Sequence, residues 1–323
     1  MKSAAATASA LVDDPLVPLP TTEALVVRAP RATAAPSARL RDYLALAKLR
    51  IVALVLVVTL FGFLMAAHAA LDGHQIAALL HTLIGTALAA AGANALNQHI
   101  ERAHDAVMQR TRFRPLPAGR IAPRDALLLG VAAGTFGVSY LAVLVGTYAA
   151  LLTAGTFLSY VLLYTPLKRV TPWSLLVGAV PGALPPLIGW SAAAGRLDHQ
   201  AWLLFGIMYL WQIPHFLAIA WRYRDDYARA GFPMLSVVDP SGRQSARHIV
   251  FGSMALLLAS LLPNAYHMSG PLYFAGALLL GAAFLLFGVA VALRRTPTVA
   301  RWHLLASLVY LPAIFGIMLI DRI

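Results

Sequence analysis

The stretch IVALVLVVTLFGFLMAAHAA, residues 51–70, runs for twenty positions without an acidic or basic side chain of the Asp, Glu, Lys or Arg type. A helix of about 20 mostly apolar residues is long enough to span the hydrocarbon core of a bilayer. Two cations, Lys48 and Arg50, precede it immediately, where a membrane surface accommodates them. The stretch therefore predicts a first transmembrane helix.

The same pattern recurs along the chain. Of its 323 residues, 60% are hydrophobic and only 12% are charged, whereas soluble domains carry about 25% charged residues. We therefore predict an all-α, polytopic membrane protein, with nine transmembrane helices in a bundle around a central cavity. Eight further spans are expected at approximately 76–97, 125–145, 147–164, 173–194, 201–221, 248–266, 271–293 and 302–320.

The lysines and arginines predict the orientation of these spans. With the N-terminus inside, all 25 of them except Arg196 and Arg322 fall before the first span or in loops on the inner side. Cytoplasmic loops are enriched in Lys and Arg, so we expect an N-in, C-out topology. The net charge of +12 follows from this distribution and does not imply a nucleic-acid partner.

The N-terminal 40 residues have a different composition, rich in Ala, Pro, Thr and Ser. No apolar run follows Lys2, so residues 1–40 are expected to be a disordered cytoplasmic tail rather than a cleaved targeting peptide. Residues 41–323 are expected to form one intramembrane domain. The chain has no cysteine, which excludes disulfides, thiolate metal ligands and a thiol nucleophile.

An acidic stripe is predicted at the end of the second span, from Asn97, Glu101 and Asp105. Residues four apart on a helix differ in direction by only about 40°, so the three oxygen-bearing side chains share one face. Mg²⁺ prefers such hard oxygen ligands, together with substrate phosphates. The alternative is a solvated helix end whose charges pair locally.

Arginines follow this stripe at once, in MQRTRFRPLPAGR at 108–120. Guanidinium groups match phosphate oxygens with two parallel hydrogen bonds. Carboxylates followed by Arg110, Arg112, Arg114 and Arg120 therefore predict a metal–diphosphate site, although ordinary positive-inside arginines remain the alternative.

A second acidic cluster, Asp225 and Asp226, follows the sixth span in RYRDDYARAGFPM at 222–234. Adjacent residues on a helix point about 100° apart, so at most one of the two aspartates faces the first cluster. Two charged inside loops can converge on one ligand; the alternative is a charged loop with local ion pairs.

Three stretches of the chain resemble the UbiA superfamily of intramembrane prenyltransferases, over a region from about Asp42 to the C-terminus. The pattern Asp-Asp-Tyr-x₂-Ala-Gly-x-Pro-Met, which begins at Asp225 in the loop after the sixth span, is most similar to the haem-modifying branch of that superfamily. The stretches are NALNQHIERAHDAVMQRTRFRPLPAGRI (94–121), YTPLKRVTPWS (164–174) with GAVPGALPPLIGW (178–190), and WQIPHFLAIAWRYRDDYARAGFPML (211–235).

The resemblance implies an isoprenyl diphosphate bound through Mg²⁺. By position it implies a first catalytic and metal-binding motif of Asn97, Glu101 and Asp105, and a second of Asp226 with Asp225. Arg222 and Ala230 stand where the wider superfamily often has another aspartate, and Leu49 replaces a proline after Lys48. The diphosphate-binding residues are then expected to be Lys48, Arg110, Arg112, Arg114 and Lys168.

The haem-modifying branch further implies transfer of a farnesyl group from farnesyl diphosphate to a vinyl group of protohaem IX, giving haem O on the route to haem A. His215 is then a haem-binding candidate; the alternative is a hydrogen-bonded structural histidine. The same resemblance implies a bacterial inner membrane, an active site on the cytoplasmic side, and haem A synthase or oxidase assembly factors as partners in the bilayer.

Two other functions remain open on the sequence alone. One is a prenyltransferase that acts on a quinone precursor or another aromatic acceptor. The other is an organic-anion transporter, although an odd number of spans, no visible inverted repeat and charge clusters at the membrane face argue against it.

Overall fold

The computed structural model describes residues 39–67 and 71–323. Within these ranges nine helical spans are long and apolar enough to cross a membrane, so the predicted all-α fold of nine spans is confirmed. The predicted tail, residues 1–40, lies almost wholly outside the described residues. The helices are α1 (Leu40–Ala47), α2 (Leu49–Ala66), α3 (Gly73–Val107), α4 (Pro123–Leu144), α5 (Thr147–Leu158), α6 (Thr165–Leu167), α7 (Ser174–Ala183), α8 (Pro185–Ala194), α9 (His199–Arg222), α10 (Arg224–Arg229), α11 (Leu235–Val238), α12 (Arg243–Ala265), α13 (Pro271–Arg294) and α14 (Pro297–Ile320).

Two of the spans are interrupted. The fourth consists of α5, a π-helical segment at Ser159–Tyr164, and α6. The fifth consists of α7 and α8, which separate at Leu184 because Pro185 and Pro186 cannot supply the backbone N–H groups that a continuous helix needs. Both interruptions lie beside the cavity described below, and π-helical turns occur frequently at functional sites.

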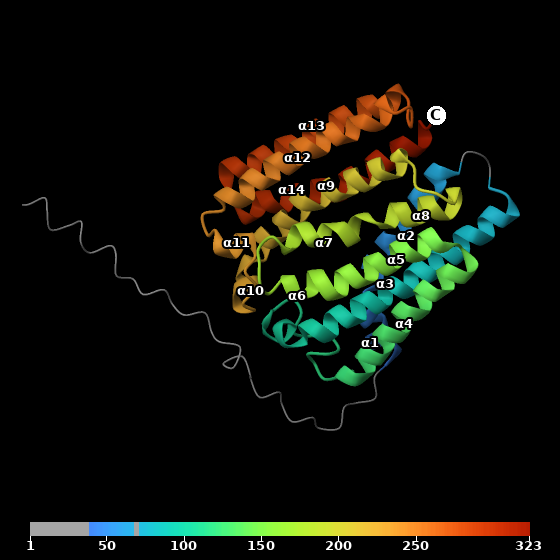
Figure 1. The fold of residues 1–323 in the computed structure, drawn as a ribbon. Helices are drawn as coiled ribbons and strands as arrows, with labels where there is room; N and C mark the ends of the chain where they lie inside the picture. The colour runs from blue at the N-terminus through green and yellow to red at the C-terminus, as the bar shows by residue number, and fades with distance from the viewer. Residues whose placement is uncertain (1–38, 68–70) are drawn as a thin grey trace, which may run out of the picture. The chain divides into compact units, whose positions relative to one another are not determined.

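Neighbours along the chain pack against each other at the two sides of the bundle (Figure 1). Helices α3 and α4 form one antiparallel pair, and α12 and α13 form another. Between them, α9 contacts α7, α12 and α14, while α2 contacts α3 and α8. Large apolar side chains such as Leu279 and Val143 point outward and are exposed, as a lipid-facing surface requires.

Close packing of α2 on α8 depends on two glycines, Gly62 and Gly189. A Cβ atom at Gly189 would lie 1.8 Å from the carbonyl oxygen of Thr59, and one at Gly62 would lie 2.0 Å from that of Pro186. Small residues let helix backbones approach in this way within membranes. Helix α2 begins directly after Lys48 and lines the cavity described below. Its contact with α8 therefore also fixes one wall of that cavity.

We predict that Gly189→Ala destabilises the protein by about 1–3 kcal/mol, because the added methyl group meets backbone that has to move. Gly206→Ala is the matched control: it lies within α9, and nothing stands within 4 Å of an added Cβ. That control is expected to leave stability unchanged or raise it by up to about 1 kcal/mol, the difference in helix propensity. Thermal unfolding of both variants in detergent measures the difference, and equal melting temperatures would contradict the prediction.

Candidate active site

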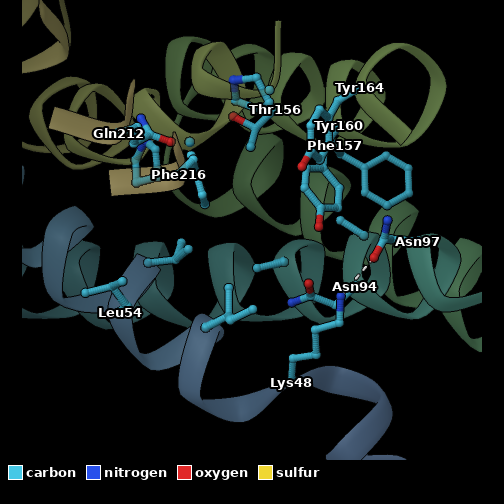
Figure 2. Close-up of a pocket in the computed structure, with 18 of the residues that line it drawn as sticks. Lys48, Leu54, Asn94, Asn97, Thr156, Phe157, Tyr160, Tyr164, Gln212 and Phe216 are labelled. Carbon is cyan, nitrogen blue, oxygen red and sulfur yellow. Dashed lines mark hydrogen bonds between the residues drawn. The ribbon is translucent and has the colours of Figure 1, made fainter. Parts of the chain in front are cut away.

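A cavity of about 490 Å³ lies between α2, α3, α5, α7 and α9. Its size is within the range of about 300–1,000 Å³ usual for small-molecule sites. One end of the cavity is lined by charged side chains and the remainder mainly by apolar ones, among them Leu54, Val58, Phe157 and Ile188. Figure 2 shows Lys48 and Asn97 toward one end, and Gln212 with Phe216 toward the other.

The acidic stripe of Asn97, Glu101 and Asp105 lies on α3, which continues beyond the predicted span to Val107. The expectation that the three share one face of a single helix is confirmed, since all three line the cavity. They are only 2%, 4% and 2% exposed, respectively. Buried carboxylates are costly unless they are paired or bind a ligand, so their partners decide what this end can do.

Each member of the stripe faces one cationic side chain from a different segment. Lys168 Nζ donates to Glu101 Oε1 at 2.8 Å. One guanidinium nitrogen of Arg114 donates to both carboxylate oxygens of Asp105, at 2.9 and 2.7 Å. The carboxylates therefore alternate with cations, an arrangement that can bind a divalent metal and a diphosphate together.

Lys48 occupies the turn between α1 and α2, in a left-handed conformation with φ of 54°. Residues other than glycine rarely adopt this conformation. The turn places Lys48 Nζ 2.8 Å from Asn97 Oδ1, the contact drawn as a dashed line in Figure 2. Burial and then repulsion from Arg114 lower the pKa of Lys48 to about 7. An anion bound at this end would favour the charged amine.

Lys168 follows the π-helical segment, at the end of the fourth span. Its ammonium lies 5.7 Å from the ring centre of Tyr164 and 4.8 Å from that of Phe232. Burial acts to lower the pKa of Lys168, but the carboxylate of Glu101 outweighs it and raises the pKa above its ordinary value. Lys168 is therefore cationic at neutral pH.

The two charged loops contact each other, and the aspartates of the second loop also form the local ion pairs that the sequence left open as the alternative. Asp226 of α10 accepts hydrogen bonds from the backbone N–H groups of Gln109 at 3.1 Å and Arg110 at 3.4 Å, and it pairs with Arg229. Burial acts to raise the pKa of Asp226, but these hydrogen bonds outweigh it and hold the pKa below its usual range. Asp226 thus fixes the loop that follows α3.

Asp225 and Asp226, which the resemblance implies as the second metal-binding motif, are arranged differently from the acidic stripe. Neither is among the residues that line the cavity. The Asp225 side chain is 84% exposed and lies 3.6 Å from the guanidinium of Arg224. The physical reason is that neighbouring side chains on α10 point apart, while the oxygens of Asp226 are occupied by the loop.

The predicted arginines also separate. Arg110 and Arg114 line the cavity. Arg110 packs over the ring of Tyr223 with its guanidinium carbon 5.0 Å from the ring centre. Arg112 is exposed, packs on Phe113 at 4.7 Å and is not among the cavity-lining residues.

The far end of this loop is anchored to α1. Arg120 Nε donates to Asp42 Oδ1 at 2.8 Å, and this hydrogen bond holds the pKa of Asp42 below its usual range. The loop between α3 and α4 is therefore held at Asp226 on one side and at Asp42 on the other, which positions Arg110 and Arg114 between them.

His215 lies on α9 and lines the cavity away from the stripe. Its ring stacks on Trp211, with ring centres 4.6 Å apart, and its Nδ1 lies 2.7 Å from Ser307 Oγ of α14. Both readings of this histidine made from the sequence remain compatible with the structure, because it is hydrogen-bonded and also faces the cavity.

Sequence reasoning missed several polar residues that line the cavity, namely Asn94, Tyr160, Gln212 and Tyr227. A signal was present for some of them. Asn94 and Gln212 are amides within apolar spans, where polar side chains are costly and often functional. Tyr160 lies four residues before Tyr164, hence on the same face of the helix.

The oxygens of the stripe suit Mg²⁺, although they do not form a closed cage. Across residues 39–67 and 71–323, no three His, Asp or Glu side chains come together closely enough to hold a metal by themselves. Mg²⁺ is usually bound by one or two carboxylates together with substrate phosphates and water. Asn97, Glu101 and Asp105 therefore fit a metal that arrives with a diphosphate.

Residues 55–310 match the UbiA prenyltransferase family. The match covers most of the chain, and the chain belongs to this family: it is a multi-pass membrane prenyltransferase. A protein from Solibacter usitatus named protoheme IX farnesyltransferase is 50% identical over 289 residues, which cover 88% of this chain and 99% of the relative.

Solved structures share the fold at low sequence identity. A structure of digeranylgeranylglyceryl phosphate synthase has a TM-score of 0.74 and 16% identity, over 87% of this chain and 98% of the other. A UbiA homologue from Archaeoglobus fulgidus, bound to GPP and Mg²⁺, has a TM-score of 0.57 and 13% identity, over 86% and 99%. These likenesses support the helical fold.

Proposed function

We propose that the chain transfers a farnesyl group from farnesyl diphosphate to a vinyl group of protohaem IX, as the name of its Solibacter relative describes for that protein. The observation that carries the proposal is the division of one cavity. Its charged end pairs carboxylates with cations, and its apolar remainder leads to His215. A diphosphate fits the first part, and a prenyl chain with a flat apolar acceptor fits the second.

The charged end binds and activates the diphosphate. Glu101 and Asp105, with the amide oxygen of Asn97, are proposed to hold Mg²⁺, which when bound neutralises charge on the leaving diphosphate. Lys48, Arg110, Arg114 and Lys168 then donate hydrogen bonds to diphosphate oxygens as negative charge develops on them. Asp226 supports the site by fixing the loop that carries Arg110.

The apolar part of the cavity keeps water from the reacting carbon until the acceptor is in place. The vinyl electrons form a bond to C1 of the farnesyl chain as its bond to the diphosphate oxygen breaks. Water adds to the resulting cation beside the porphyrin and releases one proton, which leaves a hydroxyethylfarnesyl haem and diphosphate. His215 is proposed to face the haem.

The purified protein in detergent is expected to convert protohaem and farnesyl diphosphate to a product with one farnesyl and one hydroxyl group added, in a Mg²⁺-dependent manner. Chelation of the metal with EDTA is expected to lower the rate by at least about 10²-fold, and added Mg²⁺ to restore it, since the diphosphate charge is then neutralised again. Mass spectrometry of the haem fraction measures both.

The alternative acceptors are tested in the same assay. Transfer to a quinone precursor or another aromatic compound, with none to haem, would contradict the proposed acceptor and leave the diphosphate site in place. An undiminished rate after chelation would contradict the role of the metal.

We also propose that the charged end of the cavity faces the cytoplasm of a bacterial inner membrane. The loops that follow α3 and α9 gather at one end of the bundle, and they carry many of the arginines (Figure 1). Positive loops face the cytoplasm. An apolar product formed within the bilayer can pass directly to a membrane enzyme such as haem A synthase or to an oxidase assembly factor.

This orientation can be tested without first removing any cysteine, because the chain has none. Ala118→Cys places a thiol in the exposed loop after α3, and Arg196→Cys places one in the loop between α8 and α9. In intact cells with a permeable outer membrane, an impermeant maleimide is expected to label Arg196→Cys and spare Ala118→Cys. The reverse pattern would overturn the proposed orientation.

A further inference from the structure

Ser307 of α14 does not line the cavity, yet it contacts two aromatic residues of α9 that do. Trp211 Nε1 donates to the backbone oxygen of Ser307 at 2.9 Å, and His215 Nδ1 lies 2.7 Å from its hydroxyl oxygen. Ser307 is 0% exposed and His215 is 8% exposed. Ser307 thus holds the rings of both Trp211 and His215 from the α14 side.

The hydroxyl of Ser307 has only one proton to donate. Its oxygen lies 2.6 Å from the carbonyl oxygen of Leu304, which can only accept. Two oxygens at that distance repel each other unless a proton lies between them, so the hydroxyl donates to Leu304. The remaining capacity of the Ser307 oxygen is that of an acceptor, and the proton in the contact with His215 must come from Nδ1.

A neutral imidazole carries one N–H, so a proton on Nδ1 leaves a lone pair on Nε2. A charged ring would need a counter-charge at this depth. None of the ion pairs in the described part of the chain involves His215. Nε2 has no hydrogen-bond partner among the described residues. It is also not fully enclosed by protein atoms, so a ligand can reach it.

The ring has little freedom to turn away from this arrangement. It stacks on Trp211 with an angle of 22° between the ring planes, and Trp211 is itself held by the Ser307 carbonyl. Since the Nδ1 edge faces α14, the opposite edge with Nε2 is directed toward the cavity that His215 lines.

We infer that Ser307 is a positioning residue that holds His215 in its Nδ1–H form, so that Nε2 presents a lone pair to the iron of the haem acceptor. The inference rests on the proposed function, which supplies the haem. Metal-bound histidines commonly donate their other ring N–H to a neighbouring oxygen, and losing that partner typically costs about 10–100-fold in metal affinity or activity.

The test is a titration of purified protein with ferric protohaem, without farnesyl diphosphate, followed by absorbance. His215→Ala is expected to lose the spectrum of the histidine-bound iron. Ser307→Ala is expected to weaken haem binding about 10–100-fold and raise KM for haem, with KM for farnesyl diphosphate unchanged. Ser307→Thr retains the hydroxyl and is expected to restore binding.

Ser260→Ala is the matched control, because it removes a fully buried serine hydroxyl that bonds to Tyr310, away from the cavity. It is expected to bind haem as the unaltered protein does. Nitrogen-15 NMR of the wild-type protein, labelled at its histidines, reports the tautomer of His215 in the unaltered protein. The His215 resonance, assigned by its loss in His215→Ala, is expected to show protonated Nδ1.

Distinct outcomes separate the inference from the proposal beneath it. Unchanged haem affinity and spectrum in Ser307→Ala, or a protonated Nε2, would overturn the role of Ser307 alone. An unchanged haem spectrum in His215→Ala would overturn both that role and the haem contact of His215. Farnesyl transfer, measured separately by product mass, decides the proposed function itself.

Discussion

Asp105→Ala is expected to reduce farnesyl transfer by about 10²–10³-fold or more, while the protein still folds and inserts into membranes. The carboxylate is 2% exposed, lines the charged end of the cavity and accepts two hydrogen bonds from Arg114. Its loss removes a hard oxygen ligand and leaves Arg114 without its anion. The Arg114 side chain is 27% exposed, so it can turn to water instead of remaining buried and unpaired.

Turnover by purified Asp105→Ala and Asp105→Asn measures this effect. Asparagine retains the shape and removes the charge, so a loss in both variants assigns the effect to charge. Asp225→Ala is the matched control, since it removes an equally sized carboxylate that is 84% exposed and outside the cavity. Near-normal turnover in Asp105→Ala, or a comparable loss in Asp225→Ala, would overturn this assignment of the two acidic clusters.

The acidic stripe could be predicted from the sequence because it depends only on local geometry. Asn97, Glu101 and Asp105 are four residues apart on one continuous helix, and helical periodicity places them on one face whatever packs against them. The nine spans were predictable for a similar reason. A span is defined by its own length and apolarity, and these properties need no knowledge of its neighbours.

Residues whose position depends on contacts between distant segments could not be predicted in this way. The use of Asp226 to hold backbone N–H groups of residues 109 and 110 joins positions more than a hundred residues apart. Nor did the sequence show that Arg112 would point to solvent while Arg114 reaches Asp105. Both lie in the loop after α3, which has no regular secondary structure from which side-chain directions could be predicted. Tertiary contacts determine such positions.

Lys168 illustrates the same limit. From the sequence, Lys168 and Arg169 are neighbouring cations in a short inside loop, and topology alone explains both. In the structure, the Lys168 side chain is 13% exposed and pairs with Glu101, whereas Arg169 is exposed and bonds to the backbone of α3. The two cations therefore differ in their contacts with α3, which the sequence of the loop does not reveal.

Lys168→Met is expected to lower kcat/KM for farnesyl diphosphate by about 10²-fold or more, a loss typical of a removed electrostatic contact in the transition state. Methionine fills much of the same space, so lost charge outweighs lost packing.

In Lys168→Met, Glu101 is left buried without its cation, and breaking a buried pair costs about 3–5 kcal/mol when no other partner is available. A bound metal supplies such a partner. The melting temperature of Lys168→Met should therefore recover in part when Mg²⁺ is added with diphosphate, and that of Lys168→Met/Glu101→Gln should not. Arg169→Met removes the adjacent, exposed cation and is expected to retain KM. Equal losses in Lys168→Met and Arg169→Met would mean that this loop acts only through its net positive charge.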